Sequence, residues 1–131
     1  MELLMGRIRV LVVDDDEHFA AALTATLDDD SRVEVVASAR DGLEAVARCA
    51  DVHPDVVAMD IHMPRMDGVE ATRRIRAEQS SPAVILISGS MFTDARDLAE
   101  EAGAVGYLTK AQCARGLLPA ILEAAQRPGN G

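Results

Sequence analysis

Acidic side chains, one hydroxyl and one lysine stand at the ends of separate apolar runs of the 131-residue chain. Asp14 and Asp15 follow the first run, Asp60 follows the third, Ser88 ends the fourth, and Lys110 follows the fifth. If these runs are strands of one parallel sheet, the side chains beyond their carboxyl ends converge at one edge. Carboxylates gathered there repel one another strongly unless protons or a cation compensate their charge.

A divalent cation and a phosphoryl group would suit this set of side chains. Oxygen ligands of high charge density favour Mg²⁺, with Mn²⁺ as a substitute. An aspartate beside the metal can attack phosphorus and become an acyl phosphate, while a lysine and a hydroxyl stabilise the phosphoryl oxygens. Lys110 is the only lysine among 13 basic residues, and its compact ammonium can pair with a single phosphoryl oxygen.

Taken one at a time, the same residues have ordinary structural explanations. The acids at 14–16 precede an amphipathic segment and could cap a helix. Asp60 could cap a turn, Ser88 could start a loop, and Lys110 could lie on the surface. The triplet at 28–30, which we expect in a solvated loop, shows that acidic clusters arise easily in this chain. Only the joint placement of the residues indicates a site.

The histidines and cysteines do not suggest a second site. His18, His53 and His62 have no spacing typical of a metal centre, so we expect them on the surface or in loops. Cys49 and Cys113 lie far apart without Cys-x-x-Cys spacing, so we expect buried or idle thiols rather than a disulfide or zinc ligands.

The elements that must position the site follow from the hydrophobic periodicity. Five short apolar runs are the predicted strands: 8–13, 33–38, 56–59, 83–88 and 104–108. Between and after them, apolar residues recur at helical spacing, and the five stripes are Phe19, Leu23 and Leu27; Leu43, Val46, Ala47 and Ala50; Gly68, Ala71, Thr72 and Ile75; Ala95, Leu98, Ala99 and Ala102; and Leu117, Leu118, Ile121, Leu122 and Ala125. Gly116 and Pro119 interrupt the last stripe, so we expect that helix to start near Leu117.

This alternation predicts an α/β fold built from repeated strand and helix pairs around a parallel sheet. The length fits one domain, which we place at residues 1–126, with 127–131 as a tail or the start of a linker. The formal charge of −9 and pI near 4.7 predict that the chain does not bind nucleic acid directly. No stretch suggests a membrane span or a signal peptide, so we expect no membrane association and a cytoplasmic location.

Four motifs in this order resemble the response-regulator receiver domains of two-component signalling. They are Val-Leu-Val-Val-Asp-Asp at 10–15, Pro-Asp-Val-Val-Ala-Met-Asp-Ile-His-Met-Pro-Arg-Met-Asp-Gly at 54–68, Ile-Leu-Ile-Ser-Gly at 85–89 and Gly-Ala-Val-Gly-Tyr-Leu-Thr-Lys at 103–110. The resemblance covers roughly residues 7–126. It implies a flavodoxin-like, doubly wound (βα)5 fold with a five-stranded parallel sheet of order 2-1-3-4-5.

The resemblance also implies roles for the residues at the sheet edge. Asp60 would accept a phosphoryl group from a phosphohistidine of a sensor histidine kinase, in a reaction that depends on Mg²⁺. The metal would be held by Asp14, Asp15 and Asp60 and by the backbone carbonyl of His62.

Two further roles concern the response to phosphorylation. Lys110 and Ser88 would stabilise the phosphoryl group, and Ser88 and Tyr107 would switch a surface that a partner binds.

The sequence at 103–110 is similar to that of the branch fused to helix-turn-helix output domains, which implies control of transcription through a downstream output domain or protein. A homodimer on phosphorylation is a further expectation, and turnover of a free substrate is not expected. Gly89, where alanine is usual, predicts a mobile loop before the fourth helix.

Three other functions remain as alternatives. Asp14 and Asp16 form the Asp-x-Asp of a haloacid-dehalogenase phosphatase, but His18 stands where that motif has Thr or Val and a cap domain has no room. A mononucleotide-binding flavodoxin would need a Ser/Thr/Gly-rich loop where this chain has three carboxylates, and no Gly-x-x-x-x-Gly-Lys loop exists. A degenerate receiver would bind partners without phosphorylation, although every acceptor-site residue is present here.

Overall fold

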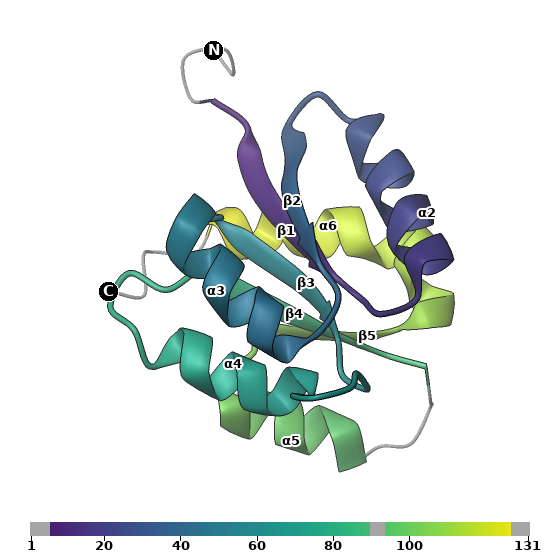
Figure 1. Cartoon of the computed structure of the whole chain (residues 1–131). Helices are drawn as coiled ribbons and strands as arrows, with labels where there is room; N and C mark the ends of the chain where they lie inside the picture. The colour runs from purple at the N-terminus through teal and green to yellow at the C-terminus, as the bar shows by residue number, and fades with distance from the viewer. Residues whose placement is uncertain (1–5, 90–93, 127–131) are drawn as a thin grey trace.

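Five parallel strands form a single sheet of order β2-β1-β3-β4-β5 in this computed structural model, which describes residues 6–89 and 94–126 (Figure 1). The strands are β1 (Ile8–Val13), β2 (Val33–Ala39), β3 (Val56–Asp60), β4 (Ala83–Ser88) and β5 (Gly106–Thr109). All four neighbouring pairs are parallel. The predicted fold class and strand order are therefore confirmed.

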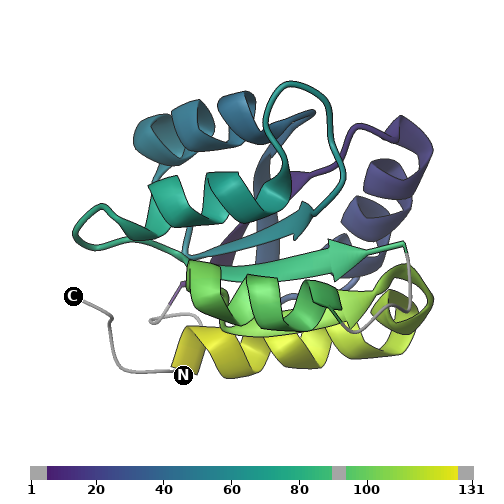
Figure 2. The same cartoon turned by 90° about the horizontal axis from the view of Figure 1, so that it is seen from below.

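Helices cover both faces of the sheet (Figure 2). They are α2 (Glu17–Asp28), α3 (Gly42–Val52), α4 (Gly68–Arg76), α5 (Asp94–Ala102) and α6 (Cys113–Gln126), and a 3₁₀ turn, η1 (Lys110–Gln112), precedes α6. Asp16, Asp41 and Asp67 cap α2, α3 and α4, and each carboxylate accepts a hydrogen bond from a backbone N–H of the first turn. These caps fix where each helix leaves the sheet.

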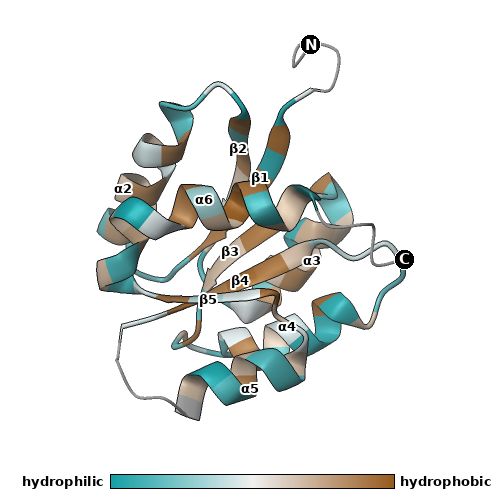
Figure 3. Cartoon of the chain, turned by 180° about the vertical axis from the view of Figure 1, so that it is seen from behind, coloured by the Kyte–Doolittle hydropathy of each residue, from teal (hydrophilic) through white to brown (hydrophobic). Residues whose placement is uncertain are grey.

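Alternate residues of each central strand enter two separate cores. Leu11 and Val13 of β1 lie in the core that includes residues of α3, α4 and α5. Val10 and Val12 lie in the core that includes residues of α2 and α6. The central strands β1, β3 and β4 are therefore mostly apolar, as their largely brown colour in Figure 3 shows. This double coverage leaves the carboxyl ends of the strands as the place where polar side chains emerge.

The predicted bounds of β1 and β4 are confirmed, and those of the other three strands differ by one or two residues. β2 extends to Ala39, and β3 extends to Asp60. β5 begins at Gly106 rather than at Ala104, because the Ala104 N–H donates to the Ala99 carbonyl and so completes the end of α5.

The predicted start of the last helix near Leu117 is wrong, because α6 begins at Cys113. Cys113, Leu117 and Ile121 are buried at helical spacing and anchor one face of the helix. Pro119 lies inside the helix on its exposed side. Burial of the apolar stripe outweighs the local cost of the proline.

The remaining fold predictions have mixed outcomes. The 28–30 triplet lies at the end of α2 and in the turn after it, where Asp30 pairs with Arg32 at 2.7 Å. The predicted mobile loop after Gly89 falls on residues 90–93, outside the described residues. Among the helices of the described ranges, none combines the length and apolarity that a membrane crossing requires.

Candidate functional site

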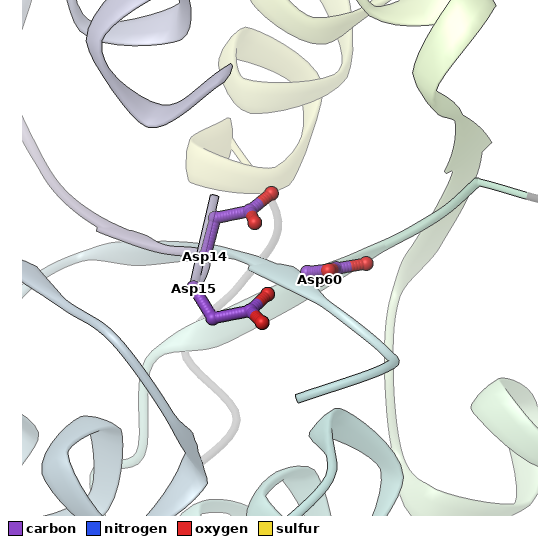
Figure 4. A group of neighbouring side chains, drawn as sticks. All are labelled: Asp14, Asp15 and Asp60. Carbon is purple, nitrogen blue, oxygen red and sulfur yellow. The ribbon is translucent and has the colours of Figure 1, made fainter. Parts of the chain in front are cut away.

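The aspartates predicted to share a metal lie together at the carboxyl end of the sheet (Figure 4). Val13 of β1 pairs with Met59 of β3, so the next residues along the two strands, Asp14 and Asp60, emerge side by side. One carboxylate oxygen from each of Asp14, Asp15 and Asp60 lies within 4.8 Å of the other two. Asp14 and Asp60 are 2% and 4% exposed, whereas Asp15 is exposed. The cluster is therefore open on the Asp15 side.

Asp14 is held by backbone hydrogen bonds, but one of its carboxylate oxygens accepts none. Its N–H donates to the Ala39 carbonyl at 3.1 Å, and its Oδ1 accepts from the Asp16 N–H at 2.8 Å. Its Oδ2 is buried and accepts no hydrogen bond. Such an atom costs free energy unless a cation or proton compensates it.

Burial and mutual repulsion set the charge state of the cluster. Burial raises the pKa of Asp60 to about 6, and the negative charge of Asp14 acts in the same direction. The Lys110 ammonium and a hydrogen bond from the His62 N–H oppose this rise. Burial also raises the pKa of Asp14. The cluster thus favours ligands that supply positive charge.

Lys110 is the first residue after β5 and faces the cluster. Its Nζ lies 3.7 Å from Oδ2 of Asp14 and 4.5 Å from the centre of the Phe19 ring. The preceding residue, Thr109, forms a capping box with Gln112, which fixes the turn that carries the lysine. The contact with Phe19 was not predicted, because Phe19 of α2 and Lys110 of η1 lie far apart in the sequence.

Ser88 and Tyr107 lie on neighbouring strands near the cluster. Ser88 is the last residue of β4, is fully buried and pairs in register with Thr109. The Tyr107 hydroxyl is buried without a hydrogen-bond partner, and the Arg96 guanidinium carbon lies 5.1 Å from the centre of its ring. The structure therefore places both residues as expected, while their predicted switching role stays a prediction.

The segment after β3 holds Asp60 by close backbone packing that sequence reasoning missed. The Gly68 N–H donates to the Ile61 carbonyl at 2.7 Å, and a Cβ at Gly68 would collide with the carbonyl oxygen of Asp60. Arg65 has a left-handed backbone with φ of 68°, and its guanidinium binds Oδ2 of Asp41 at 2.7 Å. The Asp-Gly pair at 67–68 is the sequence feature from which this close packing could have been predicted.

The histidine and cysteine side chains do not join the cluster. The side chains of His18, His53 and His62 are exposed, and in the described ranges the aspartate cluster is the only group of three or more side chains suited to a metal. Cys49 and Cys113 are free thiols, and burial raises the pKa of each to about 11. The prediction of buried or idle thiols is confirmed.

The donor set fits a hard divalent cation. Three carboxylates converge, one buried oxygen accepts no hydrogen bond, and one side is open. These are oxygen donors of high charge, as Mg²⁺ prefers. A buried carboxylate, a nearby ammonium and a buried hydroxyl also suit the capture of a phosphoryl group.

Comparisons with known proteins agree with this arrangement. A family model described as the response regulator receiver domain matches residues 10–122. The transcriptional regulatory protein LiaR of Bacillus subtilis is 39% identical over 119 residues, which are 91% of this chain and 56% of LiaR. A protein-glutamate methylesterase/protein-glutamine glutaminase of Haloarcula marismortui is 46% identical over 103 residues, which are 76% of this chain and 27% of that protein. The chain thus spans little more than half of the first of these relatives and about a quarter of the second.

A solved structure shows the same fold. The signal receiver domain of NarL from Mycobacterium tuberculosis superposes with a TM-score of 0.88 at 31% identity, covering 94% of this chain and 99% of that domain. The family match, the shared fold and the converging aspartates lead to one conclusion. The chain belongs to the response regulator receiver domain family of two-component signalling.

Proposed function

We propose that Asp60 is the phosphoacceptor of this receiver domain. A carboxylate oxygen of Asp60 attacks the phosphorus of a phosphohistidine on a sensor histidine kinase. The P–N bond breaks, its electron pair returns to the imidazole, which takes up a proton, and a new P–O bond makes an aspartyl phosphate. The observation that carries this proposal is the convergence of Asp14, Asp15 and Asp60 within 4.8 Å of one another.

We assign the metal site to Asp14, Asp15, Asp60 and the backbone carbonyl of His62. Bound Mg²⁺ would supply positive charge to the phosphoryl oxygens. Asp15 is exposed and so offers its carboxylate at the open side, whereas Asp14 offers a buried oxygen that lacks a hydrogen bond. Asp60 supplies both a ligand and the nucleophile, so its ionised form is the reactive one.

Lys110 and Ser88 stabilise the transferred group in this proposal. The Lys110 ammonium lies within reach of the cluster, 3.7 Å from Asp14, and can donate charge-assisted hydrogen bonds to a phosphoryl oxygen. Ser88 is buried at the end of the adjacent strand. Its hydroxyl, drawn toward the phosphoryl group, would change the packing available to Tyr107.

Phosphorylation of Asp60 would pass the signal on by changing a surface that a partner binds. Phosphorylation replaces one carboxylate with a group of about −1.5 to −2 charge, and the resulting change at Ser88 and Tyr107 biases a surface that a partner binds. The kinship with LiaR favours control of transcription through an output domain or protein. We further propose that residues 1–126 act as the folded unit, that the phosphorylated form dimerises, and that the chain itself does not bind nucleic acid.

The chain is proposed to modify itself rather than to turn over a free substrate. The methylesterase relatives match this chain over only a part of their length, so that kinship does not assign their activity to it. A phosphatase of the haloacid-dehalogenase type would instead hydrolyse free phosphomonoesters. An assay for phosphate released from such a compound therefore distinguishes the phosphatase from the receiver domain.

Intact-mass spectrometry tests the proposal. The folded protein is incubated with Mg²⁺ and a small acyl-phosphate donor, and we expect the gain of one phosphoryl group in wild type. Asp60→Asn, or a chelator added to wild type, should abolish the gain. Wild type that stays folded and unmodified would instead support the degenerate receiver, and release of phosphate from a free phosphomonoester would support the phosphatase.

A further inference from the structure

Two residues from distant parts of the sequence, Phe19 and Lys110, meet beside the acidic cluster. The Lys110 Nζ lies 4.5 Å from the centre of the Phe19 ring, within the roughly 6 Å range of an attractive cation–π contact. The same nitrogen lies 3.7 Å from Oδ2 of Asp14, beyond the range of a hydrogen bond. The ammonium therefore rests against the ring and forms only a long ion pair, without a hydrogen bond, with the carboxylate.

The ring is held in place by the start of α2. The N–H of Phe19 donates to Oδ1 of the capping residue Asp16 at 3.2 Å. The side chain is half-buried and packs against the core shared by α2 and α6. Both constraints fix the aromatic face beside the end of β5, so Lys110 meets a preformed surface.

The Lys110 ammonium and Oδ2 of Asp14 form only a long ion pair, 3.7 Å apart. Oδ2 of Asp14 is buried and accepts no hydrogen bond. A salt bridge at hydrogen-bond distance would place the lysine among the carboxylates that we assign to the metal. Contact with the ring instead leaves the ammonium at the rim, with its side chain 31% exposed.

We propose that Phe19 is a positioning residue that holds the Lys110 ammonium in a resting position until an anion binds beside Asp60. This inference rests on the proposed phosphoacceptor function. A phosphoryl oxygen offers a charge-assisted hydrogen bond, which is stronger than the contact with the ring at a partly exposed position. The ammonium then leaves the ring, so Phe19 stabilises the unmodified form alone.

The single lysine makes the resting contact directly observable. Lysine labelled with ¹³C at the ε carbon gives one lysine signal from the whole chain, because Lys110 is the only lysine. We expect its ε protons to resonate upfield of free lysine in the unmodified protein, because they lie over the ring. Phe19→Leu should abolish the upfield shift, and Phe19→Tyr should restore it.

An exposed apolar residue of α5 provides the control. Leu98→Ala changes a side chain that is 45% exposed, and it should leave the lysine signal upfield. Thermal unfolding of each variant verifies that the compared proteins are folded. An unshifted wild-type signal, or a shift that survives Phe19→Leu, would overturn the resting contact.

Binding of beryllofluoride with Mg²⁺, which mimics the phosphoryl group, tests the release of the lysine. In wild type the ε signal should move toward that of free lysine on binding. Phe19→Leu should bind beryllofluoride about 2- to 30-fold more tightly, because it lacks the contact that favours the unbound form, and Phe19→Tyr should stay near wild type. Weaker binding by Phe19→Leu that Tyr restores would overturn the resting role, because the ring would then act in the bound form.

The two proposals fail in different ways. If wild type binds no beryllofluoride, the phosphoacceptor function and the release step are both rejected, while the lysine signal still decides whether Phe19 holds Lys110. If wild type binds beryllofluoride and the chemical shift of the lysine ε protons is unchanged by Phe19→Leu, the phosphoacceptor function stands and the role of Phe19 is rejected.

Discussion

A carboxylate oxygen of Asp60 lies within 4.8 Å of a carboxylate oxygen of Asp14, and both side chains are buried. Two such charges in a protein interior repel each other and lose most of their hydration. Repulsion between the two carboxylates therefore destabilises the folded protein when the site binds neither a proton nor a metal ion. The pH and metal dependence of the protein's stability follow from this relationship.

The first prediction concerns pH in the absence of metal. The pKa of Asp60 is raised from 3.8 in the reference state to about 6, so the folded protein binds this proton more tightly than the unfolded chain. The stabilisation is fully present below about pH 4 and is lost as the pH rises through about 6. In the presence of a chelator, the free energy of unfolding of Asp60→Asn should rise relative to that of wild type between about pH 4 and about pH 7.5. The expected change in this difference is up to about 3 kcal/mol.

Urea unfolding of both proteins at the two pH values measures this difference. Asp51→Asn, which changes an exposed carboxylate of α3, should show no comparable change with pH. A difference between Asp60→Asn and wild type that stays constant across this range would mean that Asp60 is not held near a like charge in a buried site.

The second prediction concerns divalent cations. Mg²⁺ should raise the free energy of unfolding, by about 2.7 kcal/mol when its concentration is a hundred times its dissociation constant. Asp15→Asn removes one carboxylate of the cluster and should abolish most of this gain. Asp16→Ser keeps a residue that can cap α2 and should retain it. Thermal unfolding with Mg²⁺ and with chelator makes the comparison, and an equal loss in both variants would argue against the assigned ligands.

The third prediction concerns the backbone that holds Asp60. Gly68→Ala places a methyl group against the Asp60 carbonyl oxygen and the Ile61 Cα, which are backbone atoms that cannot move independently. We expect a loss of stability of about 1 to 3 kcal/mol and slower phosphorylation. Among the residues that the structure describes, a methyl group at Gly89 meets only the Lys110 side chain, at 4.0 Å, so Gly89→Ala should cost much less stability. Urea unfolding compares the two, and equal stability losses would contradict the close packing at Gly68.

The sequence predicted the strands well because the sheet is covered on both faces. A run such as 83–88 has no polar side, so its apolar character marked the whole of β4, whose bounds agree with the prediction. The site residues Asp14 and Asp60 followed from the same rule, because polar residues directly after buried strands must emerge at the sheet edge.

Other features depend on contacts that the sequence does not display. Pro119 suggested a late start for α6, but the burial of Cys113 one turn before Leu117 extends the helix. The approach of Lys110 in η1 to Phe19 in α2 depends on how the fold brings these two distant segments together. Such long-range packing overrides local propensity, and it cannot be derived from spacing along the chain.

Chemical mapping of the modified residue tests the central claim most directly. Borohydride reduces an aspartyl phosphate to homoserine, so peptide mass spectrometry after phosphorylation and reduction identifies the acceptor among Asp14, Asp15 and Asp60. The account predicts homoserine at position 60 alone, and only when Mg²⁺ is present. Homoserine at position 14 or 15, or no homoserine in a folded and phosphorylated protein, would contradict it.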